Sequence, residues 1–304
     1  MSETTAKPFL KWAGGKSQLL QQFDNYFPSE LKEGKIDFYF EPFLGGGAVF
    51  FFIAQKYNFK QAFLYDINKE LILTYKVVQK DVNKLIDLLY TYDVNYKRLN
   101  EDGRKAFYYE IRNDYNTIGY KINYKKYSSL WVKRAAQVIF LNRTCYNGLF
   151  RVNRQGGFNV PFGRYKNPKI VDEENLKKVS CLLKKAKIES ADFGKINRKI
   201  SEKSFVYFDP PYKPISNTAN FTSYSKCVFD DSQQKRLAEF YKELHRKKSK
   251  LMLSNSDPKN EDENDDFFDR LYSDYHIYRV DARRVINSNP EKRGLIKELI
   301  IVNY

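Results

Sequence analysis

A strand, a glycine-rich turn, a helix and a second strand follow one another within residues 36–66. Residues 36–41 form an apolar run that predicts a buried strand, and Pro42 to Gly47 predicts a glycine-rich turn. The run from Ala48 to Tyr57 is typical of a helix, and Ala62 to Asp66 of a second strand. Such a unit begins a parallel sheet with helices on its faces, so we predict an α/β fold.

The rest of the pattern extends this sheet and interrupts it once. Further strands are predicted over 187–191, 204–209, 250–254, 276–281 and 298–303. Helices are predicted over 69–89, 128–142, 172–185 and 232–246. Glycines and prolines between 146 and 168 predict loops and a hairpin, and the acidic run 260–269 predicts a solvated loop or helix start. We therefore predict a catalytic domain from 1–68 and 172–304, interrupted by a mostly helical insertion, 69–171.

Composition excludes several classes of protein. The longest uncharged apolar run, 48–54, is far shorter than the ~18 residues that span a bilayer, and residues 1–5 lack the apolar core of a secretory signal. We expect a cytoplasmic protein without a membrane partner. The three cysteines are widely spaced and there are two histidines, which argues against disulfides, a zinc site and a Ser-His-Asp system.

The chain is strongly basic, and its positive charge is concentrated. Lysine and arginine number 53 against 37 acidic residues, a formal charge of +16. Residues 115–171 contain no Asp or Glu. The basic residues there are Lys121, Lys125, Lys126, Lys133, Arg134, Arg143, Arg151, Arg154, Arg164, Lys166 and Lys169. A surface of a single sign predicts a nucleic-acid partner, although charge alone also suits general solubility.

The glycine-rich turn lies where a nucleoside could bind. Glycines after a strand let backbone amides approach a ligand at a helix start. A G-x-G-x-x-G dinucleotide-binding motif that starts at Gly45 requires glycine at position 50, which is Phe50 here. A phosphate-binding P-loop motif that ends at Ser17 requires glycine at position 10, which is Leu10 here, so neither motif is present. Asp66 follows Gly45 by 21 residues, about the ~20-residue offset of an acid that binds ribose hydroxyls. A nucleoside without a tightly held pyrophosphate, such as S-adenosylmethionine, fits this pattern of a glycine-rich turn followed by an acid. The alternative is that these residues only form a tight turn and cap a helix.

The tetrapeptide Asp209-Pro210-Pro211-Tyr212 follows the apolar strand Phe205–Phe208. The Asp209 carboxylate and the Pro210 carbonyl are two acceptors, and an exocyclic amine has two N–H donors for them. Tyr212 offers a flat ring on which a base could stack. This pattern predicts chemistry on the amino group of a base, with a rigid strand-ending turn as the alternative reading.

Several blocks, taken together, resemble the Dam-type DNA adenine-N6 methyltransferases. In those enzymes the DNA-recognition insertion lies between the glycine loop and the catalytic tetrapeptide, as the basic insertion does here. The matching blocks are Phe9–Lys16, Phe40–Gly47, Asp66, Tyr146–Arg151, Phe158–Tyr165, Asp209–Tyr212, Ala219–Tyr224 and Ser254–Ser256. The likeness extends over nearly the whole chain and implies a Rossmann-like methyltransferase sheet.

The resemblance also implies a cofactor and residue roles. S-adenosylmethionine is implied as methyl donor, without a metal. Its implied contacts are Trp12, Lys16, Glu41, Gly45, Gly47, Asp66, Asp192, Phe193 and Asp209. The implied DNA contacts are Lys11, Tyr146, Asn147, Leu149, Arg151, Pro161 and Arg164. Of these, four match positions that read the bases of GATC: Lys11, Leu149, Arg151 and Pro161. Tyr146 matches an aromatic residue that wedges into the base stack. Arg164 matches a residue that contacts the DNA backbone or the rim of the interface.

The resulting prediction is methyl transfer to N6 of adenine in double-stranded DNA, within GATC, by base flipping and direct in-line transfer. Asp209, Pro210 and Tyr212 are the predicted catalytic residues. We expect a bacterial or phage-encoded monomer, with a cognate restriction endonuclease as a further candidate partner. Cytosine-N4 or RNA amino methylation, a DNA-binding protein that has lost catalysis, and a P-loop nucleotidase are the alternatives.

Overall fold

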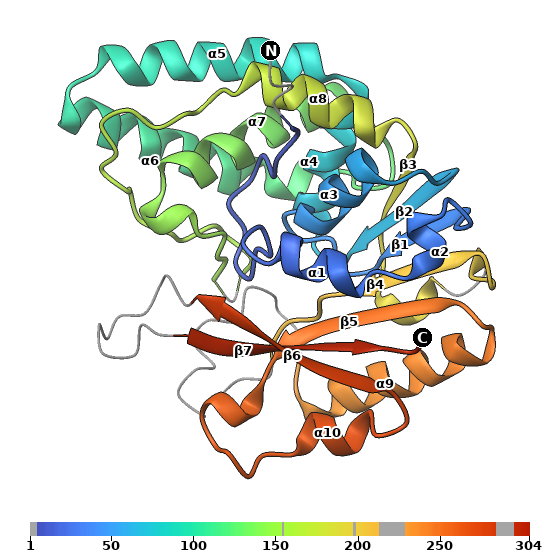
Figure 1. Cartoon of the computed structure of the whole chain (residues 1–304). Coiled ribbons are helices and arrows are strands. Elements are labelled where there is room, and N and C mark those ends of the chain that lie inside the picture. Colours follow the sequence, from blue (N-terminus) through green and yellow to red (C-terminus); the bar gives the residue numbers. More distant parts are fainter. Residues whose placement is uncertain (1–4, 154, 197–198, 213–228, 284–294) are drawn as a thin grey trace.

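A seven-stranded sheet forms the centre of the molecule (Figure 1). The computed structural model describes residues 5–153, 155–196, 199–212, 229–283 and 295–304. The strands are β1 (Phe38–Glu41), β2 (Gln61–Asp66), β3 (Ala186–Ser190), β4 (Ser204–Phe208), β5 (Lys250–Ser256), β6 (His276–Arg283) and β7 (Leu295–Val302). Their order is β3-β2-β1-β4-β5-β7-β6; β1 to β5 are mutually parallel, and β7 runs antiparallel to both of its neighbours. The predicted α/β fold with a largely parallel sheet is confirmed.

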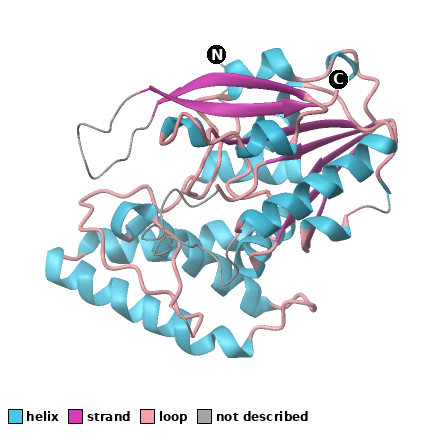
Figure 2. Cartoon of the chain, turned by 90° about the horizontal axis from the view of Figure 1, so that it is seen from below, coloured by secondary structure: helices cyan, strands magenta, loops and turns pink. Residues whose placement is uncertain are grey.

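Alternate strand residues supply two separate cores on the two faces of the sheet. In β4, Phe205 and Tyr207 belong to the larger core, whereas Val206 and Phe208 belong to the smaller one. The smaller core is closed by α9 (Asp231–Arg246) and α10 (Phe267–Leu271) (Figure 1), and Figure 2 views the molecule from the side on which these helices lie. Both faces of β4 are therefore buried, as expected for a central parallel strand.

The larger core is covered by the remaining helices. They are α1 (Leu20–Tyr26), α2 (Ser29–Lys32), α3 (Ala48–Lys56), α4 (Lys69–Lys80), α5 (Val82–Arg98), α6 (Glu101–Ile118), α7 (Ser129–Thr144) and α8 (Glu173–Leu183). Helix α7 packs against α4, α5 and α6, and α4 also packs against β2 and β3. The larger core therefore continues from the sheet into the bundle α5–α7.

One sequence-based expectation about helices is wrong, and one long helix was missed. The helix predicted over 69–89 is two helices, because Asp81 has φ −132° and ψ 42°, outside the helical region. Helix α6 was not predicted. Its buried positions Tyr108, Ile111 and Tyr115 are helically spaced but mostly tyrosine, so the apolar stripe is weak in sequence. No helix within the described ranges is long and apolar enough to cross a membrane.

Candidate active site

The ends of five strands place polar side chains at one edge of the sheet. Glu41 ends β1, Asp66 ends β2, and Asp209 directly follows β4. Since these strands are parallel, their carboxyl ends meet at this edge, where open α/β sheets bind ligands. Strand β7 is antiparallel and brings Glu298 to the same edge, paired with Ser256, the last residue of β5. The edge therefore gathers four carboxylates.

Lys16 lies at the centre of this group and is 3% exposed. Its Nζ is 2.7 Å from Asp209 Oδ1 and 3.8 Å from Glu298 Oε2. It also donates to the Tyr212 hydroxyl, 2.7 Å away, and to the Gly14 carbonyl, 3.1 Å away. The Tyr212 hydroxyl in turn donates to Glu298 Oε1 at 2.5 Å. One buried cation thus joins the N-terminal loop at Gly14 to the predicted catalytic tetrapeptide and to Glu298 of β7.

Burial and charge act against each other on these groups. Burial alone would lower the pKa of Lys16, but the negative charges of Asp209 and Glu298 outweigh it and raise that pKa above its usual value. Burial raises the pKa of Asp209, and Lys16 partly offsets the effect. Burial likewise raises the pKa of Glu298, again against the influence of Lys16. Lys16 and the two carboxylates beside it therefore each favour the charged form of the other, against the effect of burial.

Two further side chains orient Asp209. The Ser254 hydroxyl on β5 donates to Asp209 Oδ1 at 3.3 Å and lies 2.7 Å from the Tyr207 hydroxyl on β4. The carbonyl of Pro211 accepts from Gln234 Nε2 on α9 at 3.2 Å, whereas within the described part of the chain nothing donates to the Pro210 carbonyl. Of the two acceptors predicted to hold an amine, the Asp209 carboxylate is thus held by Lys16 and Ser254, and the Pro210 carbonyl has no described donor.

The glycine-rich turn is anchored by Asp66. Its carboxylate accepts from the Gly45 amide at 3.0 Å and from the Asn68 amide at 2.8 Å, and these bonds oppose the rise in pKa that burial causes. Gly47 has φ +71°, and a Cβ there would lie 2.6 Å from the Tyr75 hydroxyl. No side chain is accommodated at this position, so the turn is built for glycine.

Glu41 lies beneath this turn and is buried. The Tyr39 hydroxyl donates to Glu41 Oε2 at 2.7 Å. Burial raises the pKa of Glu41 well above its usual value, and Asp209 and Asp66 raise it further. The structure places Glu41 among the residues that support the edge of the sheet.

The segment after β3 supplies an aromatic group. Phe193 is buried, with its ring centroid 5.5 Å from that of Phe43 and 6.0 Å from that of Phe229. The Asp192 carboxylate is held by Arg236 of α9, whose charge, against the effect of burial, lowers the pKa of Asp192. Phe193 therefore contacts the glycine-rich turn, while Asp192 is turned toward α9.

The residues predicted to contact DNA come together on the surface around residues 145–164. Tyr146 donates its amide to the Pro161 carbonyl at 2.9 Å, and Arg151 Nε donates to Asn159 Oδ1 at 2.9 Å. Asn147 and Arg164 both have a positive φ, 56° and 55°. The exposed members of this set are Lys11, Tyr146, Asn147, Arg151, Pro161 and Arg164, and Leu149 is half-buried.

Trp12 connects this surface to the cofactor loop. Its ring stacks on Phe150 with centroids 5.5 Å apart, and its Cδ1 lies 3.1 Å from where a Cβ of Gly45 would be. The preceding residue, Lys11, is held on α7, because its backbone N–H and C=O both bond the side chain of Asn142. The segment Lys11–Trp12 thus contacts both predicted binding regions. The matching block 219–224 lies outside the described residues.

Comparison with known proteins decides the family. The model of the D12 class N6 adenine-specific DNA methyltransferases matches residues 12–286. The chain belongs to this family. It is 53% identical over 299 residues to the type II methyltransferase M.MjaIII of Methanocaldococcus jannaschii, covering 98% of this chain and 99% of the relative.

Two more distant relatives of this D12-class methyltransferase also match along their length. The type II methyltransferase M1.LlaDCHI of Lactococcus lactis is 39% identical, covering 98% of this chain and 95% of the relative. The DNA adenine methylase of Haemophilus influenzae is 33% identical, covering 97% and 93%. The predicted resemblance to Dam-type enzymes is confirmed, and this chain is an adenine-specific DNA methyltransferase.

Membership of a methyltransferase family implies S-adenosylmethionine as the donor, and the residues present fit it. The Asp66 carboxylate at the glycine-rich turn and the aromatic side chains around Phe193 match the ribose and the base of such a ligand in chemistry. The described residues hold no group of His, Cys, Asp and Glu that could bind a metal ion.

Sequence reasoning missed Glu298, Ser254 and Tyr207 as parts of this site. Ser254 stood within a block that matched the family, but no role was assigned to it. Glu298 carried a signal of its own, because it is a carboxylate followed directly by the apolar run Leu299–Val302 of β7. A charge at such a position has to find a partner, and here the partners are Lys16 and Tyr212.

Proposed function

We propose that this methyltransferase modifies the adenine of GATC in double-stranded DNA, taking the target base out of the helix into the edge of the sheet at Asp209–Tyr212. The observation that supports it best is the placement of Asp209 and Pro210. The half-buried Asp209 carboxylate beside Lys16 and the Pro210 carbonyl are consecutive acceptors directly after β4. An amino group with two N–H donors is the chemical complement of this pair.

Asp209 and Pro210 would hold the two N–H groups of adenine N6, while Tyr212 lies under the base. This orientation turns the nitrogen lone pair toward the methyl donor, so that an N–C bond forms as the C–S bond breaks. S-adenosylmethionine supplies the methyl group on a sulfonium, whose positive charge makes the sulfur a good leaving group. The departing N6 proton leaves along the hydrogen bond to Asp209, whose pKa is raised by burial.

The donor would be held by residues around the glycine-rich turn. We assign it to Trp12, Lys16, Asp66 and Asp209, with the backbone of Gly45 and Gly47. Phe193 would flank the adenine of the donor. Glu41 and Asp192 were predicted to join them, and their partners Tyr39 and Arg236 support indirect roles, in holding β1 and the segment after β3.

The surface around residues 145–164 would read the DNA. Arg151 has the planar fork that binds guanine O6 and N7, and Leu149 and Pro161 suit the methyl group of thymine. Tyr146 is 55% exposed, as a side chain that enters the base stack must be. Lys11, Asn147 and Arg164 complete the proposed contact. We assign the DNA-recognition part to 69–171, with α4 shared between it and the sheet.

The test is to identify the methylated base and its sequence. Plasmid incubated with the enzyme and S-adenosylmethionine is digested to nucleosides for mass spectrometry, and separately cut with nucleases that differ in sensitivity to GATC methylation. We expect N6-methyladenine and a change in cleavage at GATC alone. Methylation of cytosine N4, or of RNA in preference to DNA, would overturn the proposal.

Asp209→Ala isolates the proposed chemistry from binding. We expect it to lower the methylation rate by at least about 10³-fold, because both orientation of N6 and the proton acceptor are lost. DNA affinity should stay within about twofold. An Asp209→Ala enzyme that still methylates adenine at the wild-type rate would contradict the role given to Asp209.

The family contains enzymes in two settings. Two relatives are named type II methyltransferases and a third a DNA adenine methylase. The higher identity of the type II relatives supports the prediction of a cognate restriction endonuclease that cuts the same sequence. That the enzyme acts as a cytoplasmic monomer stays a prediction.

A further inference from the structure

We propose that Glu298 is a positioning residue for methyl transfer: it gives Lys16 a second partner and so frees Asp209 for the amine of the target base. The inference rests on the proposed role of Asp209. It concerns how that carboxylate becomes available, since in the structure its Oδ1 is already engaged by Lys16 at 2.7 Å.

The geometry provides a second place for the lysine. Glu298 Oε2 lies 3.8 Å from Lys16 Nζ and accepts no hydrogen bond from any described residue, although it is fully buried. A buried carboxylate oxygen without a donor is unfavourable, so it attracts a nearby cation. Moving Nζ by roughly 1 Å would bring the pair to the ~2.8 Å of a charge-assisted hydrogen bond.

The same side chain fixes the ring on which the base would lie. Glu298 Oε1 accepts from the Tyr212 hydroxyl at 2.5 Å, and Lys16 donates to that hydroxyl at 2.7 Å. Tyr212 would therefore keep its bond to Glu298 while Lys16 moves from one carboxylate to the other. One glutamate thereby holds the stacking ring and receives the lysine.

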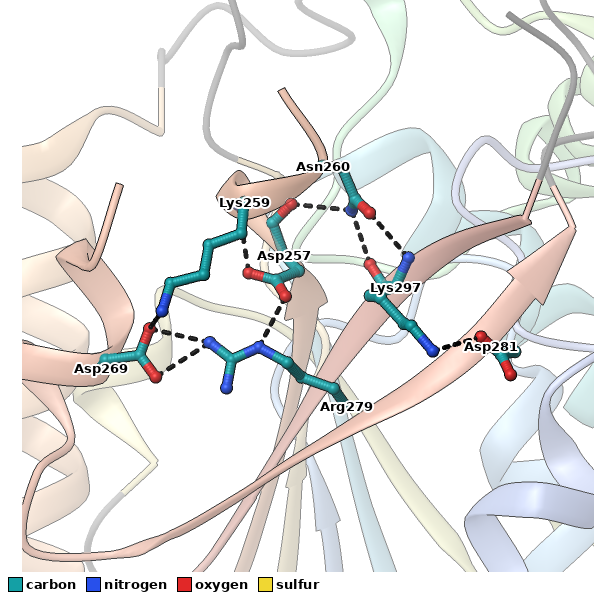
Figure 3. Close-up of polar contacts among 7 residues, drawn as sticks. All are labelled: Asp257, Lys259, Asn260, Asp269, Arg279, Asp281 and Lys297. Atoms are coloured by element: carbon teal, nitrogen blue, oxygen red, sulfur yellow. Dashed lines mark hydrogen bonds and ion pairs between the residues drawn. The ribbon is translucent and has the colours of Figure 1, made fainter. Parts of the chain in front are cut away.

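The surroundings hold Glu298 rigidly at this edge. On one side its strand pairs with Ser256 of β5. The preceding residue, Lys297, is clamped through its main chain: Asn260 Nδ2 donates to the Lys297 carbonyl at 2.7 Å, and the Lys297 amide donates to Asn260 Oδ1 at 2.7 Å (Figure 3). Asn260 Nδ2 also donates to the Asp257 carbonyl, so the end of β5 and the start of β7 are held together. A rigid acceptor of this kind suits a positioning role.

The proposed role depends on the negative charge of Glu298. The variant Glu298→Gln removes this charge but keeps the size of the side chain and an oxygen that can accept from Tyr212. We expect the single-turnover methylation rate to fall by about 10- to 100-fold, because Lys16 then stays on Asp209. The Kd values for S-adenosylmethionine and for DNA should remain within about threefold, and the melting temperature within a few degrees. A structural role alone would lower stability and both affinities together with the rate.

The matched control is Asp281→Asn. It removes one carboxylate from the same pair of strands, where Asp281 lies at the surface and pairs with Lys297 at 2.6 Å (Figure 3). We expect its rate to stay within about twofold of wild type. An equal loss in both variants would show a general effect of charge and overturn the proposal.

A complex of the wild-type enzyme with GATC-containing DNA and S-adenosylhomocysteine tests the same point without a variant. The proposal requires Lys16 Nζ to lie closer to Glu298 Oε2 than to Asp209 Oδ1 when the adenine is in the site. Lys16 remaining on Asp209 would overturn it, even if Glu298→Gln does not fold. If the wild-type enzyme leaves adenine unmethylated, the proposed function fails; if it methylates and Glu298→Gln keeps the full rate, only this inference fails.

Discussion

Single residues at the edge of the sheet sit where small changes have large effects. Gly47 combines a left-handed backbone with a neighbour, the Tyr75 hydroxyl, that a Cβ would approach to 2.6 Å. Glu41, at the end of β1, and Lys16, in the loop before α1, are both buried ionisable groups. Both kinds of position lie at or beside the proposed donor site.

Replacing Gly47 by alanine should lower both stability and donor affinity. Gly34 is the matched control, since it has the same φ, +71°, but nothing within 4 Å of an added Cβ. We expect Gly34→Ala to cost about 1 kcal/mol of unfolding free energy for backbone strain, and Gly47→Ala about 1–3 kcal/mol more because of the clash. Denaturant unfolding and calorimetric titration of S-adenosylmethionine measure the two effects; equal costs in both variants would show that the contact with Tyr75 is unimportant.

Glu41 gives the stability of the fold a pH dependence. Burial, the largest cause, raises its pKa in the folded chain well above the value of 4.5 in the unfolded chain. Below pH 4.5 both states are protonated and Glu41 has no effect; as pH rises above it, the unfolded chain loses the proton first, so stability falls. In Glu41→Gln this loss of stability is absent, because the glutamine side chain does not ionise. We therefore expect its unfolding free energy, measured from pH 4 to pH 8, to gain on the wild type as pH rises; a constant difference would contradict the account.

At the scale of elements, charged side chains tie the last strands together beyond the site. Arg279 on β6 donates to Asp257 after β5 at 2.7 Å and to both oxygens of Asp269 on α10 at 2.8 Å (Figure 3). Asp257 is 2% exposed, so its charge depends on this partner. The network fixes the turn that carries Asn260, and through it the start of the described part of β7.

Breaking this network should cost more than breaking a surface pair. Arg279→Met leaves the buried Asp257 carboxylate without its cation, and we expect a loss of about 2–3 kcal/mol, below the ~3–5 kcal/mol of a fully buried pair because Arg279 is partly exposed. Lys297→Met, which removes the exposed pair with Asp281, should cost about 0–1 kcal/mol. Urea unfolding of both variants measures this, and equal losses would show that burial of Asp257 does not matter.

The elements also show what the sequence could and could not predict. The apolar strands and Asp209-Pro210-Pro211-Tyr212 were found because their signals are local. The break at Asp81 was missed because the apolar pattern continues across it, and α6 because tyrosines form its buried face. Glu298 was missed because it meets Lys16 only through the antiparallel return of β7, a contact across 282 residues. Its partner is set by topology, which a local pattern does not contain.

At the scale of the whole molecule, the charge of +16 should govern DNA binding. Phosphate contacts by lysine and arginine release counterions, so affinity falls steeply with salt. We expect the Kd for a GATC duplex to rise by about 10²- to 10⁴-fold between 50 and 200 mM NaCl, an effect of several phosphate contacts. Fluorescence anisotropy at a series of salt concentrations measures the slope. A Kd independent of salt would contradict a basic DNA-binding surface.

Arg151→Ala and Lys169→Ala separate base reading from this general attraction. Arg151 is exposed within the proposed reading surface, whereas Lys169 is exposed beyond it and pairs with Asp172. We expect Arg151→Ala to lose about 1–3 kcal/mol of preference for GATC over a changed site, and Lys169→Ala to leave that preference intact. Competition binding with the two duplexes gives the comparison; an unchanged preference in Arg151→Ala would remove it from the reading residues.

The most direct test of the account is where the methyl donor binds. A crystal of the enzyme soaked with S-adenosylmethionine should show the donor against the glycine-rich turn and Asp66, with its methyl group directed at the space beside Asp209 and Pro210. A donor bound away from residues 209–212 would contradict the proposed site.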